Sequence, residues 1–187
     1  MRIISGKAKG TKLYTLDGKN TRPTLDRIKE PLFSIIQTYI EDSIVLDLFS
    51  GSGALALEAL SRGAKKAVLC DKSYDAINII KKNIEKTHME EKTEVLCSDY
   101  QKCIFTVKEK FDIIFIDPPY KLDIAVKSIE MILQNNLLSN DGIIIIETDD
   151  EIRELQEIGK LNYNIKILGQ RTYGRVKLIF LKKEKRG

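Results

Sequence analysis

The amino-acid sequence predicts a doubly wound α/β fold whose seven-stranded sheet is parallel except near its C-terminal end. From residue 43 onward, short apolar runs alternate with helical stretches, a pattern typical of a parallel sheet wrapped on both faces. Only the short segment 169–175 joins the last two apolar runs. A parallel crossover needs about a dozen residues or more, so we expect these two strands to pair antiparallel.

The individual elements follow from this alternation of apolar runs and helical patterns. The expected strands are Ile44–Leu48, Ala67–Cys70, Glu94–Leu96, Ile113–Ile116, Ile143–Glu147, Asn164–Leu168 and Val176–Leu181. The expected helices between them are Gly53–Arg62, Tyr74–Lys86, Tyr100–Lys108, Ile124–Asn135 and Glu151–Ile158. A chain of 187 residues with 43% hydrophobic residues can bury a core as one domain over residues 1–187.

The segment before the first strand divides into a basic arm and a helix. Residues 1–23 predict a short arm or hairpin, and the main body occupies residues 24–187. The hydroxyl of Thr24 can cap a helix that begins there, and Ile28 and Leu32 fall on one face of it. Pro31 lies inside this pattern and lacks a backbone donor, so we expect a kink there or a late helix start.

The distribution of charge favours a polyanionic partner. The net charge is +4, yet the first 31 residues alone carry eight basic and three acidic residues. Basic termini beside a near-neutral body are typical of nucleic-acid contact, although solvated ends that merely aid solubility give the same pattern.

The remaining composition indicates a cytoplasmic protein without a membrane or metal site. No apolar run approaches the roughly 20 residues that span a bilayer, and Met1–Gly10 contains no secretory h-region. Cys70, Cys97 and Cys103 form no CxxC pair, so we expect buried reduced thiols. The lone His88 makes a metal site improbable.

A glycine loop follows the first expected strand, where open α/β sheets bind their ligands. The run Asp47-Leu48-Phe49-Ser50-Gly51-Ser52-Gly53 allows a tight turn and close approach of the backbone to a ligand. Residues 51–56 also satisfy the dinucleotide pattern G-x-G-x-x-G/A. The Asp47 carboxylate would repel a pyrophosphate, which favours a cationic adenosine ligand such as S-adenosylmethionine.

The next two strand ends supply further candidates for the same ligand. Asp71 could accept both ribose hydroxyls, although a surface Asp is a common alternative. Asp99 could accept from the adenine amino group while Tyr100 packs near the ring, although an Asp at this place is often only a helix cap. The full candidate set for cofactor binding is Asp47, Phe49, Ser50, Gly51, Gly53, Asp71, Lys72, Asp99 and Tyr100.

The fourth strand ends in Asp117-Pro118-Pro119-Tyr120, the most specific pattern in the chain. Two prolines stiffen the loop, so its carbonyls can be aimed. The Asp117 carboxylate and the Pro118 carbonyl can hold the two hydrogens of a base amino group and direct its lone pair toward a methyl donor. Tyr120 can stack on an extruded base. Asp117, Pro118 and Tyr120 are therefore the candidate catalytic residues for direct in-line transfer.

These motifs resemble those of a known family. The set Asp47–Gly53, Asp71, Asp99 and Asp117–Tyr120 looks like that of class I amino-methyltransferases, which have a Rossmann-like fold. The block Arg22-Pro23-Thr24, Asp26-Arg27, Lys29-Glu30 and Leu32-Phe33 resembles RsmD-type bacterial enzymes. So do Ile4-Ser5-Gly6, Lys9-Gly10 and Tyr173-Gly174, whereas Pro31 departs from the family pattern.

The resemblance implies a substrate. RsmD-type enzymes methylate guanine N2 in 16S ribosomal RNA, at guanine 966. It implies S-adenosylmethionine as cofactor, a partly assembled small subunit with ribosomal proteins as partner, and a monomeric enzyme. The residues expected to face RNA are Lys7, Lys9, Lys12, Arg22, Thr24 and Arg27. Arg22 and Arg27 could instead pair only with Asp26 and Glu30.

Other functions use parts of the same pattern. Methylation of adenine N6 in DNA or RNA would use the same Asp-Pro-Pro-Tyr loop. A glutamine-amide methyltransferase is less favoured because such enzymes usually carry Asn at the position of Asp117. A nicotinamide-dependent oxidoreductase could use the glycine loop but leaves Asp117–Tyr120 unexplained. A non-enzymatic RNA-binding module is the remaining alternative.

Overall fold

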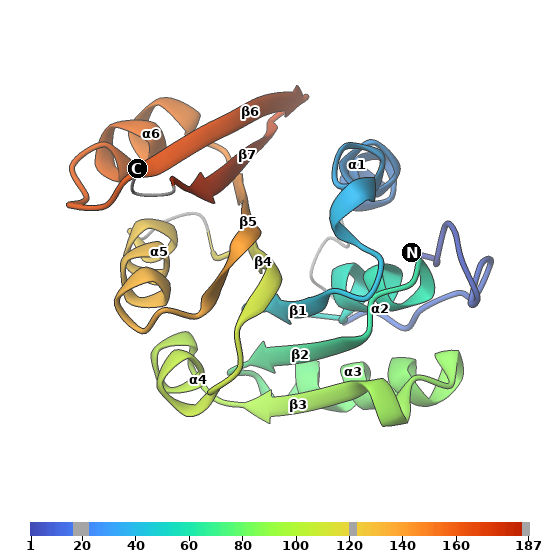
Figure 1. Ribbon diagram of the computed structural model, residues 1–187. Coiled ribbons are helices and arrows are strands. Elements are labelled where there is room, and N and C mark those ends of the chain that lie inside the picture. Colours follow the sequence, from blue (N-terminus) through green and yellow to red (C-terminus); the bar gives the residue numbers. More distant parts are fainter. Residues whose placement is uncertain (17–22, 120–122, 185–187) are drawn as a thin grey trace.

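One seven-stranded sheet organises the chain (Figure 1). The computed structural model describes residues 1–16, 23–119 and 123–184, without the side chains of 23–26. The strands lie in the order β3-β2-β1-β4-β5-β7-β6. Their bounds are β1 Ile44–Asp47, β2 Lys66–Asp71, β3 Thr93–Cys97, β4 Phe111–Ile116, β5 Leu138–Thr148, β6 Ile165–Tyr173 and β7 Val176–Lys183. The helices are α1 Pro23–Ile35, α2 Ala54–Ser61, α3 Tyr74–Thr87, α4 Tyr100–Thr106, α5 Ile124–Gln134 and α6 Glu151–Ile158, with 3-10 turns η1 Gln37–Tyr39 and η2 Glu90–Lys92.

The pairing of the strands confirms the predicted topology. Strands β1 to β5 pair in parallel, whereas β7 pairs antiparallel with both β5 and β6. Two strands are longer than expected: β6 ends at Tyr173, five residues after Leu168, and β5 begins at Leu138, five residues before Ile143. The intervening Ser139, Asn140 and Asp141 are polar, and the register against β4 shifts between Phe111 and Ile113. Apolar periodicity could not reveal this irregular part of the strand.

Two hydrophobic cores lie on opposite faces of the sheet. Because successive side chains of a strand point to opposite faces, Val45 belongs to the core that packs against α1, α2 and α3. Leu46, the next residue, belongs to the core that packs against α4, α5 and α6. Burial on both faces explains why the central strands are uninterrupted apolar runs.

The helix before the first strand is continuous across Pro31. It begins at Pro23 rather than late, so the expected late start is wrong. Proline suits the first turn of a helix because its fixed φ is already helical and its missing N–H would have no intrahelical partner. Ile28, Leu32 and Phe33 turn toward the sheet and are almost completely buried.

The N-terminal segment forms a hairpin, as expected, and it packs along α2 (Figure 1). An antiparallel bridge joins Arg2 and Lys12, and the Ile3 N–H donates to the Thr11 carbonyl at 2.9 Å. We call residues 1–14 the arm. Ile3 and Leu13 are buried against the main core, so the arm is a packed part of the fold.

A buried carboxylate, Glu58, fastens the arm to the body. Its side chain is fully buried on α2. The Ile4 and Ser5 N–H groups donate to it at 2.8 and 3.0 Å, and Lys29 Nζ lies 3.1 Å away. Arg62 Nε adds a fourth contact at 2.8 Å. A buried charge is tolerated only with such partners, so Glu58 fixes the arm, α1 and α2 together.

Two of the three cysteines are buried. Cys70 and Cys103 are buried as expected, but Cys97 is exposed because it ends β3, an edge strand of the sheet.

Among the described residues, no helix has the length and apolar content to cross a membrane.

Loss of the Glu58 carboxylate should destabilise the protein strongly. Glu58→Gln removes the buried charge that Lys29, Arg62 and the arm N–H groups contact, so we expect the free energy of unfolding to fall by about 3–5 kcal/mol. Glu157→Gln is the matched control, because Glu157 pairs with Lys160 on the surface of α6 and such pairs contribute about 0–1 kcal/mol. Urea denaturation of both variants measures the difference, and equal losses would contradict the assigned role of Glu58.

Candidate active site

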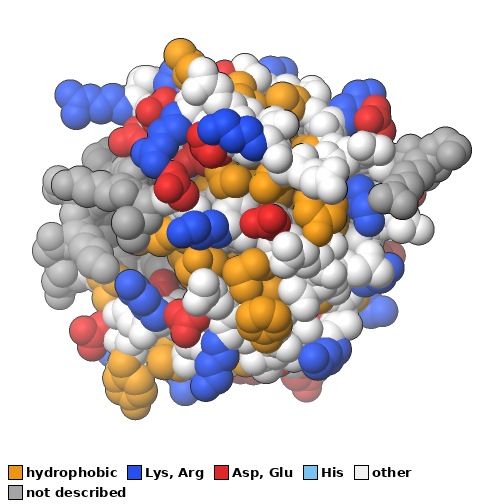
Figure 2. All heavy atoms as spheres, turned by 90° about the vertical axis from the view of Figure 1, so that its left-hand side faces the viewer, with side chains coloured by type: hydrophobic (Ala, Val, Ile, Leu, Met, Phe, Trp, Pro, Cys, Tyr) orange, Lys and Arg blue, Asp and Glu red, His pale blue; other side chains and the backbone are white. Residues whose placement is uncertain are grey.

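The candidate residues meet at the carboxyl edge of the parallel strands. Asp47, Asp71 and Asp117 lie at or just after the ends of β1, β2 and β4, and Asp99 follows β3. These four strands are consecutive in the sheet, so residues far apart in sequence share one edge. Figure 2 views the molecule from the side toward which the β2 and β3 arrowheads of Figure 1 point, and hydrophobic side chains gather at its centre among acidic and basic ones.

Hydrogen bonds within the glycine loop, residues 47–53, and from the loop to β2 hold it in position. Ser50 N–H donates to the Cys70 carbonyl at 2.9 Å, and Ser50 Oγ donates to the Asp47 carbonyl at 2.7 Å. Gly51 and Gly53 both have positive φ, 56° and 79°. A Cβ on Gly53 would meet Leu69 at 2.9 Å, whereas a Cβ on Gly51 would meet nothing within 4 Å. Gly53 therefore allows helix–strand packing, and Gly51 borders open space.

Asp71 organises this loop. Its two carboxylate oxygens accept hydrogen bonds from the Gly51 N–H at 2.9 Å and from the Ser73 N–H at 2.8 Å. Each carboxylate oxygen has a further lone pair, so the side chain can still accept from a ligand hydroxyl. The candidate ribose acceptor thus also fixes the position of the loop.

Asp47 is the most perturbed acid of the edge. Its side chain is buried, and its Oδ2 has no hydrogen-bond partner among the described residues. Burial raises the pKa of Asp47 to about 7, and the nearby charge of Asp71 adds to the rise. A buried acceptor oxygen without a partner suits a ligand that brings a hydrogen-bond donor or a positive charge.

Two aromatic rings and a capping carboxylate lie next to the loop. The rings of Phe49 and Tyr100 pack with centroids 5.7 Å apart. Asp99 caps α4, because its Oδ1 accepts from the Lys102 N–H at 3.0 Å. The helix-cap alternative is therefore realised, and it leaves Oδ2 of Asp99 able to accept from a ligand. Lys72 is exposed after the end of β2.

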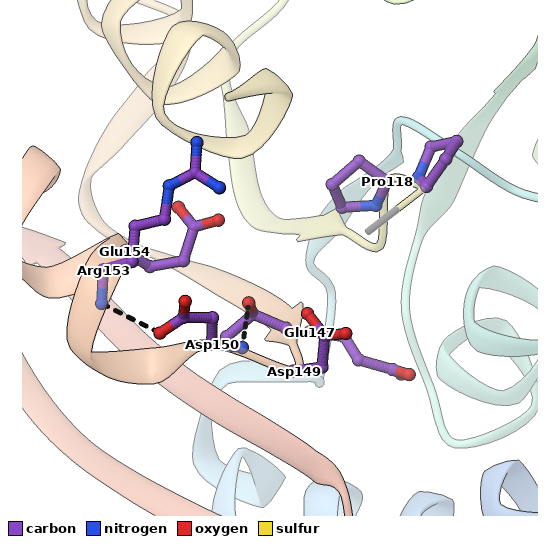
Figure 3. Close-up of a pocket in the computed structure, with 8 residues that line it drawn as sticks. Pro118, Glu147, Asp149, Asp150, Arg153 and Glu154 are labelled. Carbon is purple, nitrogen blue, oxygen red and sulfur yellow. Dashed lines mark hydrogen bonds between the residues drawn. The ribbon is translucent and has the colours of Figure 1, made fainter. Parts of the chain in front are cut away.

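The proline loop borders a cleft that the sequence analysis did not predict. Asp117 is half-buried, Pro118 is buried and Pro119 is exposed, while Tyr120 lies outside the described residues. The cavity volume of this cleft is about 20 Å³ (Figure 3). Its lining residues are Pro118, Pro119, Glu147, Thr148, Asp149, Asp150, Arg153 and Glu154. The signal available in the sequence was the polar run Glu147–Glu151, which begins in the last residues of β5.

This cleft is acidic and internally braced. Arg153 makes an ion pair with Asp123. The backbone N–H of Arg153 donates to Asp150 at 3.1 Å (Figure 3). Partial burial raises the pKa of Glu154. Carboxylates accept hydrogen bonds and repel phosphates, so the cleft suits the donor groups of a ligand and not its phosphates.

The residues expected to face RNA are not all at this edge. Lys7, Lys9, Lys12 and Arg27 are exposed. The Lys7 N–H, however, donates to the carbonyl of Ser61 at the far end of α2, a helix of eight residues and thus roughly 12 Å long. The arm therefore extends from the glycine loop to the opposite edge. Arg22 lies outside the described residues, and of Thr24 only the backbone, within α1, is described.

The described part of the chain holds no group of three or more His, Cys, Asp or Glu side chains placed to bind a metal ion.

Comparison with known proteins identifies relatives over nearly the whole chain. The family model described as conserved hypothetical protein 95 matches residues 1–182. Ribosomal RNA small subunit methyltransferase D of Haemophilus influenzae is 37% identical over 157 residues, which cover 81% of this chain and 80% of that protein. The protein of the same name from Escherichia coli K12 is 34% identical and covers 81% of this chain and 76% of its own length.

A solved structure from Escherichia coli, provisionally described as a methyltransferase (yhhF), superposes with a TM-score of 0.87 at 30% identity. The superposition covers 100% of this chain and 99% of that chain.

The raised pKa of Asp47 predicts how stability depends on pH. Above about pH 4 the unfolded chain loses this proton, whereas the folded protein keeps it until about pH 7. The folded state binds more protons in this window, so Asp47 makes stability fall as pH rises from about 4 to about 7.

Asp47→Asn should remove this contribution. Urea denaturation at pH 5 and pH 8 measures the change, and the expected result is a smaller loss of stability in the variant than in the parent protein. The comparison uses the difference between the two pH values, because the amide can alter stability at both. An unchanged difference would show that Asp47 titrates normally.

Proposed function

The chain belongs to the conserved hypothetical protein 95 family of RsmD-type methyltransferases, and we propose that it methylates the exocyclic N2 amino group of a guanine in 16S ribosomal RNA, at position 966. The methyl donor in this proposal is S-adenosylmethionine. The observation that carries the proposal is the adjacency of two different sites on β1 and β4. One is a glycine loop with a buried carboxylate whose Oδ2 lacks a partner among the described residues, and the other is a stiff Asp-Pro-Pro loop.

The residues at the end of β1 fit the proposed cofactor. Oδ2 of Asp47 lacks a partner among the described residues, and Gly51 borders open space. Asp47 would accept from the cationic amino-acid part, Asp71 from the ribose hydroxyls, and Asp99 from the adenine amino group. Phe49 and Tyr100 would line the ring, with Ser50, Gly53 and Lys72 completing the set. Bound there, S-adenosylmethionine supplies an activated methyl group on a sulfonium.

The residues after β4 would hold the acceptor. The lone pair of a base amino nitrogen is delocalised into the ring, so the nitrogen is a weak nucleophile. Asp117 and the Pro118 carbonyl would accept its two hydrogens, direct the lone pair toward the donor and stabilise the positive charge that develops on nitrogen. After the nitrogen–methyl bond forms and the sulfur–methyl bond breaks, Asp117 can take the surplus proton. Tyr120 would stack on the flipped base.

The acidic cleft supports guanine over adenine as the target. A guanine presents donors at both N1 and N2 on its pairing edge, whereas an adenine presents an acceptor at N1 beside its N6 donor. The carboxylates of Glu147, Asp149, Asp150 and Glu154 line the cleft next to Pro118. They would accept from the guanine donors and face the adenine N1 lone pair unfavourably.

The exposed basic residues would contact RNA phosphates. Lys7, Lys9 and Lys12 on the arm, together with Arg22, Thr24 and Arg27, are the proposed contacts. Such contacts position a nucleic acid without reading its sequence. We place the reaction in the cytoplasm, with a monomeric enzyme and a partly assembled small subunit as substrate, in which ribosomal proteins complete the binding surface.

The product nucleoside tests the chemistry. Undermodified small subunits incubated with labelled S-adenosylmethionine should yield N2-methylguanosine on digestion and mass analysis. Asp117→Ala should lower kcat by roughly 100-fold, because one preorganised partner of the transition state is lost. Asp75→Ala, an exposed carboxylate on α3, is the control and should leave kcat within about twofold. N6-methyladenosine as the sole product would refute the guanine assignment.

The salt dependence of binding tests the arm. Replacing both Lys7 and Lys9 by Ala should weaken binding to ribosomal RNA and reduce the slope of log affinity against log salt by roughly 1.4–1.8, because each phosphate contact contributes about 0.7–0.9. The control replaces Lys108 and Lys110, which are exposed between α4 and β4, where α4 packs on the other face of the sheet from the arm. Equal slopes for the two double variants would exclude the arm tip from the RNA contact.

A further inference from the structure

A buried amide, Asn83 on α3, joins the arm to the glycine loop. Its side chain is fully buried. Its Oδ1 accepts from the Tyr14 N–H at 2.7 Å, and its Nδ2 donates to the Tyr14 carbonyl at 3.0 Å. The same Nδ2 donates to the Ser52 carbonyl at 2.9 Å. One carboxamide thus bridges two segments that are otherwise 38 residues apart in the chain.

A second contact joins the same two segments. Ser52 Oγ donates to Met1 Sδ at 3.7 Å, and the Leu13 N–H donates to the Met1 carbonyl at 3.0 Å. Met1 and Tyr14, the two ends of the arm, are therefore both joined to Ser52, Met1 directly and Tyr14 through Asn83. Gly51, the preceding residue, borders open space where the proposed cofactor would lie. The loop is placed between the arm on one side and the ligand space on the other.

The other end of the arm is fixed to the helix that begins at this loop. Ser61, at the end of α2, accepts from the Ala8 N–H at 2.9 Å and donates to the Ser5 carbonyl at 2.6 Å. Gly6 lies so close that a Cβ there would come within 1.7 Å of the Ser61 carbonyl oxygen. The arm consequently runs as a strap along α2, with exposed lysines at its tip and Asn83 at its base.

We propose that Asn83 is a positioning residue that couples the arm to the glycine loop, so that RNA on the arm and cofactor on the loop strengthen each other's binding. This inference rests on the proposed function. Each ligand would restrain the segment that it contacts, and Asn83 would pass this restraint to the other segment, so the second ligand binds to a segment that fluctuates less. Because binding free energies are linked, the enhancement must be the same in both directions.

Two substitutions of Asn83 separate coupling from folding. Asn83→Leu has a similar branched shape but no polar atoms, and Asn83→Ser leaves room for water to satisfy the freed groups. Thr87→Val is the matched control on the same helix. Thr87 is also buried, and its hydroxyl donates only to the α3 carbonyls of Asn83 and Ile84. Thermal melts of all three variants measure how far each one destabilises the fold.

The measurements are hydrogen–deuterium exchange and ligand binding, neither of which requires methyl transfer. In the parent protein, S-adenosylmethionine should slow hydrogen–deuterium exchange in the arm, including the Tyr14 amide, and should tighten binding of a ribosomal RNA fragment. In both Asn83 variants this protection and this enhancement should be lost, and the Kd for S-adenosylmethionine should rise about tenfold, as for one lost buried partner. Thr87→Val should retain all three properties of the parent protein.

The outcomes distinguish this inference from the proposed function. If the parent protein binds S-adenosylmethionine but the Asn83 variants match Thr87→Val in exchange, coupling and Kd, the coupling role is refuted and the proposed function stands. If either folded Asn83 variant retains the enhancement, the role is likewise refuted. If the parent protein does not bind S-adenosylmethionine, the proposed function fails and this inference fails with it.

Discussion

The burial of Glu58 constrains how the arm, α1 and α2 pack together on one face of the sheet. Its carboxylate has no access to solvent, so its charge must be balanced inside the protein. The balance comes from Lys29 on α1, Arg62 on α2 and two N–H groups of the arm. Three segments that do not form the sheet are thereby held in one position. The glycine loop leads directly into α2, so its placement depends on the same network.

The site at the carboxyl edge combines opposite electrostatic demands. At the end of β1, a buried Asp47 with a raised pKa and an unpartnered Oδ2 among the described residues suits a cationic ligand. Beyond β4 and β5, the acidic cleft suits hydrogen-bond donors. Lys7, at the tip of the arm, lies at the far end of α2 from the glycine loop. A polyanionic substrate could therefore be held by its backbone at one place while a neutral base enters another, since phosphates and carboxylates repel each other.

Several parts of the site lay beyond local sequence patterns. The arm appeared in the sequence as a basic extension, but its close packing depends on Glu58, Ser61 and Asn83, which are 53 or more residues away from their partners in the arm. The acidic cleft forms because the segment after β5 folds next to Pro118. Asp71 could be recognised as a residue at a strand end, yet its bonds to Gly51 and Ser73 required the adjacent positions of β1 and β2.

The sequence by itself determined the strands and helices, the topology and the identity of the loops at the carboxyl edge. Apolar runs of the length of β1 and β4 can be buried only in a covered sheet, and Gly51, Gly53 and Pro118 restrict the backbone locally. Tertiary structure decided which side chains share a site and which are buried. The pKa of Asp47, the continuous course of α1 through Pro31 and the bridge made by Asn83 arise from desolvation, packing and contacts between distant segments, and none of these is encoded in neighbouring residues.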